Sequence, residues 1–131
     1  MNSVAEANEF FLKDRFATEA ASRVIEAVGE DYAKCSITLE PKHYNAAGRV
    51  MGGAIFTLAD FTFAVASNTP EKLTVSLTSQ ICYLGAVKGK KIIAESEKVK
   101  YGKTTCTFLI HVADELGTQV ALVTITGMRV K

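Results

Sequence analysis

The sequence predicts an α+β protein in which one antiparallel sheet wraps around a single buried helix. Two observations carry this prediction. Residues 54–68 contain neither glycine nor proline. Their apolar side chains cover every side of a helix, which is typical of a buried helix. From Lys72 onward, apolar residues recur with a period of two, which indicates strands. A sheet curled around the helix is the simplest arrangement that buries both.

Three elements are expected before the buried helix. Residues 6–20 carry a rough apolar face at helical spacing and predict an N-terminal helix. Residues 32–39 alternate between two faces and predict a strand. Residues 23–28 could extend the N-terminal helix or form a strand, and we expect a strand that pairs with 32–39 across the turn-like residues 29–31.

Four long runs rich in β-branched residues follow the helix. The runs cover residues 73–84, 91–101, 104–113 and 118–130. The segments between them are short enough for antiparallel hairpins, so the sequence predicts a four-stranded meander. Together with the two earlier segments this gives about six strands in a single domain that spans residues 1–131.

Composition excludes several classes of function. The formal net charge of +1 gives no bulk attraction to nucleic acid, and no run of eighteen apolar residues is present to span a membrane. The first residues lack the order of a secretion signal, so we expect a cytoplasmic protein. Three cysteines without a C-x-x-C spacing are expected to be small buried side chains. Two histidines give no metal cluster, and no metal site is expected.

The central helix carries two features that suit catalysis. Gly52 and Gly53 would expose free N–H groups at the positive end of the helix, where an anion or a developing oxyanion can bind. Asp60 is the only ionisable residue between Arg49 and Glu71, and a carboxylate in such apolar surroundings is either a satisfied structural group or a reactive one.

The spacing of these features predicts a homodimer. Gly52 and Asp60 lie eight residues apart, which is about 12 Å along a helix. A catalytic carboxylate and the oxyanion donors must both lie about 3 Å from one reacting centre. One helix cannot provide both groups, but two antiparallel copies related by a two-fold axis can.

A motif in this region resembles a known family. Asn45, Gly48, the run Met51-Gly52-Gly53 and the run Thr57-Leu58-Ala59-Asp60 match the pattern N-x-x-G-x-x-H-G-G followed by T-L-x-D/E. This pattern is typical of the hot-dog-fold acyl-CoA thioesterases, in particular the PaaI-like (phenylacetic acid degradation) group. The resemblance covers the chain from about Phe16 to the C-terminus. Two positions depart from it, because Met51 replaces the usual His and Ala64 stands where some branches have Ser or Thr.

The resemblance implies a role for each motif residue. The Gly52 N–H, with Gly53 nearby, would polarise the thioester carbonyl, and Asp60 of the partner subunit would act as nucleophile or as general base. Asn45 would orient the carboxylate or the attacking water. Met51 cannot hydrogen-bond as His does, so it would only shape the acyl pocket.

Further residues are expected to hold the substrate. Phe56 and Tyr83 are candidates for the walls of the acyl pocket, together with Phe61 and Phe63, although such phenylalanines are also common in simple cores. The turn Lys103-Thr104 corresponds to a turn near the nucleotide in the family. A second basic turn contains Lys88, Lys90 and Lys91, and these lysines are either phosphate ligands or solvated turn residues.

The resemblance therefore implies an acyl-CoA thioesterase that hydrolyses a small, medium-chain or aromatic acyl-CoA to the free acid and CoA. It would need no cofactor, because coenzyme A belongs to the substrate. Its partners would be this substrate and copies of itself, as a homodimer or a dimer of dimers, with no nucleic acid or membrane. The alternative is a weakly catalytic or non-catalytic acyl-CoA-binding protein, which Met51 and Ala64 favour. A hydratase is disfavoured because no His is suitably placed.

Overall fold

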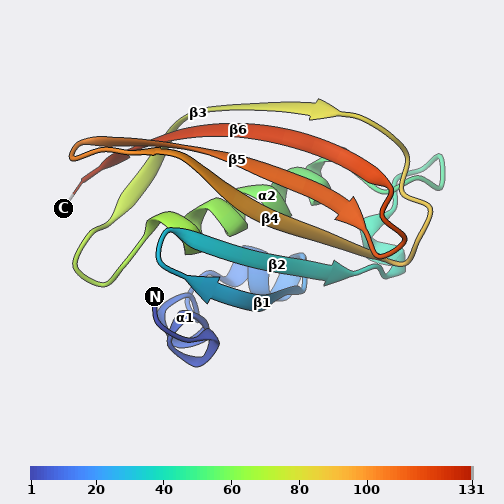
Figure 1. Cartoon of the computed structure of the whole chain (residues 1–131). Helices are drawn as coiled ribbons and strands as arrows, with labels where there is room; N and C mark the ends of the chain where they lie inside the picture. The colour runs from blue at the N-terminus through green and yellow to red at the C-terminus, as the bar shows by residue number, and fades with distance from the viewer. Residues whose placement is uncertain (131) are drawn as a thin grey trace.

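The computed structural model describes residues 1–130. The elements in chain order are α1 (Val4–Phe10), the π-helix η1 (Phe16–Ala20), β1 (Arg23–Gly29), β2 (Tyr32–Thr38), the 3₁₀-helix η2 (Pro41–His43), α2 (Gly52–Ser67), β3 (Thr74–Tyr83), β4 (Lys91–Tyr101), β5 (Thr105–Asp114) and β6 (Gln119–Arg129). The six strands form one antiparallel sheet that curves around α2 (Figure 1). The predicted sheet around one helix is therefore confirmed, and residues 23–28 form a strand as expected.

Alternation along the strands explains how the sheet covers the helix. In β5, buried and more exposed residues alternate along the whole strand, and the buried set includes Phe108 and Ile110. Phe63 of α2 meets Phe108 edge-to-face with ring centroids 5.7 Å apart. Phe63 also lies against Gly127 of β6, where an added Cβ would come within 2.7 Å of the ring. Phe61 is buried as well, so both of these phenylalanines belong to the core.

The predicted meander is wrong in its strand order. The sheet runs β1-β2-β4-β5-β6-β3, so β3 pairs with β6 and not with β4 (Figure 1). The connection 84–90 is therefore a crossover from one edge of the sheet to its middle and not a hairpin. This order makes β3 an edge strand. Most of its residues are exposed, including the apolar side chains of Val75 and Leu77.

The composition of the central helix predicted burial on every side, and this prediction is wrong. Ile55, Leu58 and Phe63 face the core, but Asp60 and Ala64 on another side are only half-buried. This side also carries apolar residues such as alanine and phenylalanine, so the hydrophobic pattern of the sequence does not reveal that it is partly exposed. One partly open stripe therefore runs along α2 and includes the only carboxylate of the helix.

The N-terminal helix predicted over residues 6–20 is interrupted. Ser3 caps α1 by accepting the Glu6 N–H through its side chain, and α1 ends at Phe10. A short turn then leads into η1, which has the wider π-helical turn, and Ser22 after it has a positive φ of 58°. Apolar spacing does not distinguish a continuous α-helix from an α-helix followed by a π-helical turn.

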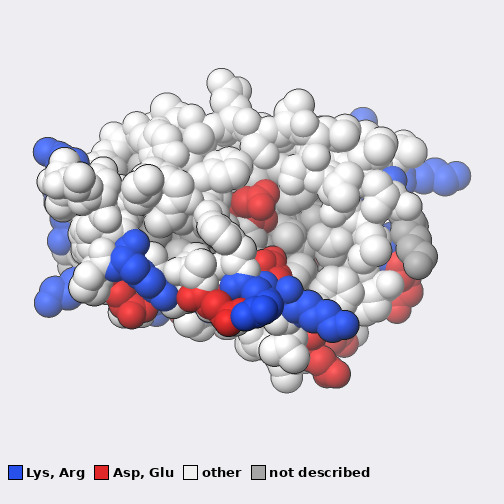
Figure 2. Space-filling view, turned by 180° about the vertical axis from the view of Figure 1, so that it is seen from behind, with Lys and Arg blue, Asp and Glu red and all other residues white. Residues whose placement is uncertain are grey.

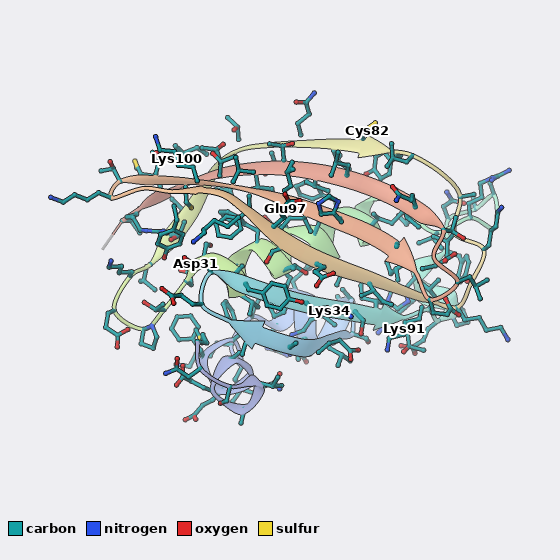
Figure 3. All side chains as sticks on the ribbon, in the orientation of Figure 1. Asp31, Lys34, Cys82, Lys91, Glu97 and Lys100 are labelled. Carbon is teal, nitrogen blue, oxygen red and sulfur yellow. The ribbon has the colours of Figure 1, made fainter. Side chains whose placement is uncertain are left out.

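Side chains on the outer face of the sheet are mostly polar. Lys34 of β2, Glu97 of β4 and Cys82 of β3 lie on this face (Figure 3). Cys82 is exposed while the other two cysteines are buried, so the expectation of a buried cysteine is wrong at this position. His111 is exposed and its Nε2 lies 2.7 Å from Glu97. Within residues 1–130, no cluster of three or more His, Cys, Asp or Glu side chains could hold a metal ion, and no helix there is long and apolar enough to cross a membrane.

Candidate active site

The first turn of α2 presents two backbone N–H groups that no side chain caps. Met51, the residue before the helix, has an extended backbone (φ −59°, ψ 130°) and makes no side-chain capping bond. Its carbonyl accepts the first intrahelical bond, from Ala54 N–H at 3.0 Å. The N–H groups of Gly52 and Gly53 precede this bond, so they are available to a ligand at the positive end of the helix.

Tyr83 at the end of β3 holds the first residue of the helix in place. Its hydroxyl donates to the Gly52 carbonyl at 3.0 Å. A Cβ on Gly52 would lie 2.9 Å from the Tyr83 hydroxyl oxygen, so the close approach of the phenol needs glycine there. A Cβ on Gly53 would meet only Met51 Cγ, at 3.9 Å. A side chain at position 52 would therefore displace the Tyr83 phenol, whereas one at position 53 would meet no such obstacle.

Asp60 lies two turns farther along α2 and is half-buried. Its Oδ1 is 3.5 Å from the hydroxyl of Ser76 on β3. Partial burial raises the pKa of Asp60, the Ser76 hydrogen bond acts in the opposite direction, and the charge of Asp14 adds to the rise. Sequence reasoning missed Ser76, because a contact between a helix and an edge strand leaves no local signal.

Asn45 organises its own loop. Its side-chain oxygen accepts the N–H groups of Ala47 at 2.9 Å and Arg49 at 3.1 Å. Gly48 in the same loop has φ 76°, a left-handed conformation that favours glycine. Within one chain, the Asn45 oxygen is thus committed to the loop, and Asn45 does not hydrogen-bond Asp60.

Two hollows flank the head of α2. The larger has a volume of about 610 Å³, and its lining includes Asn45, Arg49, Gly52 and Tyr83. The smaller, of about 360 Å³, is lined in part by Phe16, Met51, Gly53 and Ala54. Phe56 lines neither hollow and packs against the core. The head of α2 therefore stands between two separate spaces, and Gly52 and Gly53 face different ones.

The lysines selected from the sequence lie at different places. Lys103 and Thr104 are exposed in the turn between β4 and β5, at the end of the sheet where α2 finishes (Figure 1). Lys88 and Lys90 belong to the connection 84–90, part of which lines the larger hollow. Lys91 instead pairs with Glu26 at 3.1 Å. One chain thus brings the second basic turn, but not Lys103, near Gly52.

Charge is unevenly distributed over the face seen in Figure 2, where one acidic side chain stands alone near the middle. Seen from the side opposite to Figure 1, acidic and basic side chains gather along the lower edge, and most of the area above them carries neither (Figure 2). Asp60 lines neither hollow, and about 12 Å of helix separates it from Gly52. The geometry of one chain therefore supplies two uncapped N–H groups and a half-buried carboxylate without bringing them together.

Comparison with known proteins identifies the family. Residues 47–121 match the family model of the Thioesterase superfamily. The chain belongs to this superfamily. A protein of Archaeoglobus fulgidus named "Putative esterase" is 38% identical over 110 residues, which are 83% of this chain and 71% of that protein.

Two solved structures agree with this assignment. The PaaI protein of Escherichia coli, from the phenylacetic acid degradation operon, superposes with a TM-score of 0.86 at 23% identity, covering 98% of this chain and 96% of that one. A hypothetical thioesterase from Streptococcus pneumoniae, solved with coenzyme A, gives a TM-score of 0.82 at 26% identity, covering 93% and 95%. The hot-dog fold and the resemblance to PaaI-like thioesterases are confirmed, and the superfamily supports hydrolase activity in general.

Proposed function

We propose that this superfamily member is an acyl-CoA thioesterase that hydrolyses small, medium-chain or aromatic acyl-CoA thioesters. The observation that carries the proposal is the uncapped pair of N–H groups at the head of α2, beside a hollow of about 610 Å³. A half-buried carboxylate on the same helix supplies the second chemical group. The coenzyme A bound to the Streptococcus pneumoniae relative supports the choice of thioester.

The reaction uses the N–H groups and the carboxylate in different roles. Attack on the thioester carbonyl places negative charge on its oxygen, and the Gly52 N–H stabilises this oxyanion. Asp60 either takes a proton from the attacking water or attacks the carbonyl itself to form a mixed anhydride that water then hydrolyses. Collapse of the tetrahedral species breaks the C–S bond and releases CoA as its thiol once the sulfur is protonated. Water is the only co-reactant, so no cofactor is required.

The proposal includes a second copy of the chain. Gly52 and Asp60 of one helix are too far apart to act on one carbonyl, and the open stripe of α2 leaves Asp60 accessible to a neighbour. The unpaired edge of β3, with exposed Val75 and Leu77, offers a surface for association. Two copies joined there about a two-fold axis would set one α2 antiparallel to the other. Gly52 of each chain would then lie near Asp60 of its partner.

A non-catalytic acyl-CoA-binding protein is the second candidate. The observation that favours it is Met51, which lines the smaller hollow but has no group that can donate or accept a proton. Such a protein would keep the hollows and the affinity for acyl-CoA and would lack turnover.

Hydrolysis of an acyl-CoA panel separates the two candidates. Purified wild type and Asp60→Ala are compared on acetyl-, butyryl-, octanoyl- and phenylacetyl-CoA, with release of free thiol as the readout. The thioesterase proposal expects turnover by the wild type and a loss of at least about 100-fold in Asp60→Ala. Binding of several acyl-CoAs without cleavage would favour the second candidate. Equal turnover by both proteins would remove Asp60 from the mechanism.

A further inference from the structure

The two uncapped N–H groups at the head of α2 belong to different peptide units. The Gly52 N–H shares its unit with the Met51 carbonyl, and the Gly53 N–H shares its unit with the Gly52 carbonyl. The Met51 carbonyl accepts two backbone N–H groups, from Ala54 at 3.0 Å and from Ile55 at 3.3 Å. The first of the two peptide units is therefore held by the helix itself.

The second peptide unit is also held from outside the helix, by Tyr83. The Tyr83 hydroxyl donates to the Gly52 carbonyl at 3.0 Å. Tyr83 is the last residue of β3 and pairs with Ala121 of β6, so the sheet fixes the place of its ring. The ring lies close to the helix, because a Cβ on Gly52 would come within 3.1 Å of the ring carbon that bears the hydroxyl. The phenol thus reaches one particular peptide unit, whose N–H is that of Gly53.

A hydrogen bond to the carbonyl of a peptide unit makes the N–H of the same unit a stronger donor. The partial double bond between carbon and nitrogen lets the oxygen draw electron density from the nitrogen. Hydrogen bonds that are linked in this way strengthen one another by about 10–30% per bond. The N–H groups of a first helical turn point out of the helix end, so those of Gly52 and Gly53 can both reach an oxygen placed there.

A second phenol in the larger hollow shows that the contact of Tyr83 is specific. Tyr44 and Tyr83 both line this hollow, and both are partly exposed. Among residues 1–130, the Tyr44 hydroxyl has no hydrogen-bond partner, whereas the Tyr83 hydroxyl is committed to the Gly52 carbonyl. Tyr83 therefore does more than form a wall of the hollow.

The strand that carries Tyr83 also contacts the carboxylate of the proposed site. β3 runs along the edge of the sheet (Figure 1). Its Ser76 hydroxyl lies 3.5 Å from Asp60, and its Tyr83 hydroxyl lies 3.0 Å from the Gly52 carbonyl. One edge strand thus contacts both ends of the segment of α2 that carries the N–H groups and the carboxylate.

We propose that Tyr83 is a positioning residue, whose hydroxyl orients and polarises the Gly52–Gly53 peptide so that the Gly53 N–H joins the Gly52 N–H as a donor to the oxyanion. Tyr83 itself neither gives nor takes a proton in the reaction, and no bond of the substrate changes at its oxygen. Its effect belongs to the transition state, because negative charge develops on the thioester oxygen only there. This inference rests on the proposed thioesterase function.

Kinetics of Tyr83→Phe and Tyr44→Phe test the proposal. Loss of one complete oxyanion donor lowers kcat by about 10²- to 10³-fold, and a bond that strengthens the donor by about 10–30% accounts for about two- to eightfold of that loss. For butyryl-CoA, Tyr83→Phe should therefore lower kcat by about two- to eightfold with little change in KM. Tyr44→Phe removes a hydroxyl from the same hollow and should leave kcat unchanged. An unchanged kcat in Tyr83→Phe, or an equal loss in Tyr44→Phe, overturns the proposal.

Fluorinated tyrosines at position 83 distinguish polarisation from simple support. Replacing Tyr83 by 3-fluorotyrosine or by 3,5-difluorotyrosine keeps the ring and the hydroxyl but makes the hydroxyl a stronger donor. At a pH where the phenols are neutral, kcat should rise from tyrosine to the difluoro form. A phenolate cannot donate, so kcat should fall along an alkaline limb that lies at the lowest pH for the difluoro form. A tyrosine that only supports the helix would give neither result, and that outcome overturns the proposal.

The amide nitrogen of Gly53 gives a readout that needs no turnover. In protein labelled with ¹⁵N-glycine, loss of the hydroxyl in Tyr83→Phe returns electron density to this nitrogen and should move its resonance upfield, more than that of Gly52. If the Gly53 resonance moves so but no acyl-CoA is cleaved, the thioesterase proposal fails and the polarised peptide stands. If acyl-CoAs are cleaved and Tyr83→Phe changes neither the resonance nor kcat, this inference fails and the thioesterase proposal stands.

Discussion

The hydroxyl of Ser76 on the edge strand β3 lies 3.5 Å from the carboxylate of Asp60 on α2. Within residues 1–130 it is the only side chain that hydrogen-bonds Asp60. The contact places the proposed catalytic carboxylate beside the edge of the sheet where no strand is paired. The reactivity of Asp60 therefore depends on the edge strand as well as on the helix that carries it.

Ser76→Ala should shift the pH dependence of hydrolysis. The Ser76 hydrogen bond lowers the pKa of Asp60, whereas burial raises it. Removing the hydroxyl leaves burial unopposed, so the acidic limb of kcat/KM should move to higher pH because Asp60 acts in its ionised form. The measurement is kcat/KM for butyryl-CoA between pH 4 and 9. Ser76→Thr, which retains a hydroxyl, is the control. If the acidic limb is unchanged in both variants, the Ser76 hydroxyl does not influence the ionisation that controls catalysis.

Asp60→Asn should lose activity and gain stability at neutral pH. Burial raises the pKa of Asp60 above its value of 3.8 in the unfolded chain, so the associated stability is present below 3.8 and is lost as pH rises through the folded pKa. The ionised carboxylate is thus unfavourable at pH 7, and the neutral amide avoids that cost. Thermal unfolding should give a higher Tm for Asp60→Asn at pH 7 than for wild type, and the difference should shrink toward pH 4. A lower Tm at pH 7 would contradict this account of Asp60.

Gly53→Ala and Gly52→Ala should have different effects on stability, but both should lower activity. A Cβ on Gly53 would make only an ordinary contact of 3.9 Å with Met51 Cγ, and alanine favours the helix by about 1 kcal/mol, so the fold should be equal or more stable. Gly52→Ala forces a Cβ to 2.9 Å from the Tyr83 hydroxyl oxygen and should lower the Tm. Both should reduce kcat/KM, since each adds a methyl group beside the N–H groups that are proposed to face the substrate. Full activity in Gly53→Ala would show that the thioester does not approach this residue.

Asp114 should control stability in acid. Burial alone would raise its pKa, but the N–H groups of Lys88, Thr118 and Gly89 hold the pKa at about 2. A carboxyl whose pKa is depressed from 3.8 stabilises the fold above that value and loses this contribution as pH falls toward 2. The free energy of unfolding measured with urea should fall over this pH range in wild type. Asp114→Asn should be less stable at pH 7 and should lack much of the acid-dependent loss.

The same substitution should also affect substrate binding. Asp114 binds the backbone of the connection 84–90, and that connection supplies Val87 to the larger hollow. Asp114→Asn should therefore raise KM for acyl-CoA more than it lowers kcat. An unchanged KM would mean that the connection does not contact coenzyme A.

Elements with strong periodicity could be predicted from the sequence, and strand pairing could not. The helix expected over residues 54–68 is found at Gly52–Ser67, because an apolar run of this length without glycine or proline is too long for a typical buried strand and suits a helix. The last four strands begin and end within one residue of the predicted limits, since their alternation is sustained. The meander failed because a seven-residue connection between β3 and β4 is compatible with either a hairpin or a crossover.

The residues of the candidate site likewise divide into those that could be predicted from the sequence and those that could not. The motif from Asn45 to Asp60 was visible because it is local and lies around one helix. Ser76 was not visible, since sixteen residues, including the loop between α2 and β3, separate it from the carboxylate that it contacts. The smaller hollow was also missed, because its walls join η1 and η2 through side-chain contacts of Lys42 and His43 that periodicity does not encode.

Complementation between inactive variants tests most directly whether the site is shared between two chains. Asp60→Asn removes the carboxylate. Gly52→Pro removes the N–H at the first helical position, which tolerates proline after the extended Met51. Both are made in a Tyr83→Phe background, which removes the phenol oxygen nearest to the new ring. The two chains are co-expressed with different tags, and the mixed species is purified through both.

If the site is shared between two chains, the mixed dimer should regain activity although each parent is inactive. A two-fold dimer that contains one chain of each kind has one intact pair of Gly52 and Asp60, so it should show about half the activity per dimer of the Tyr83→Phe protein. A mixed dimer as inactive as its parents, or a monomeric Tyr83→Phe protein with full turnover, would contradict the shared site.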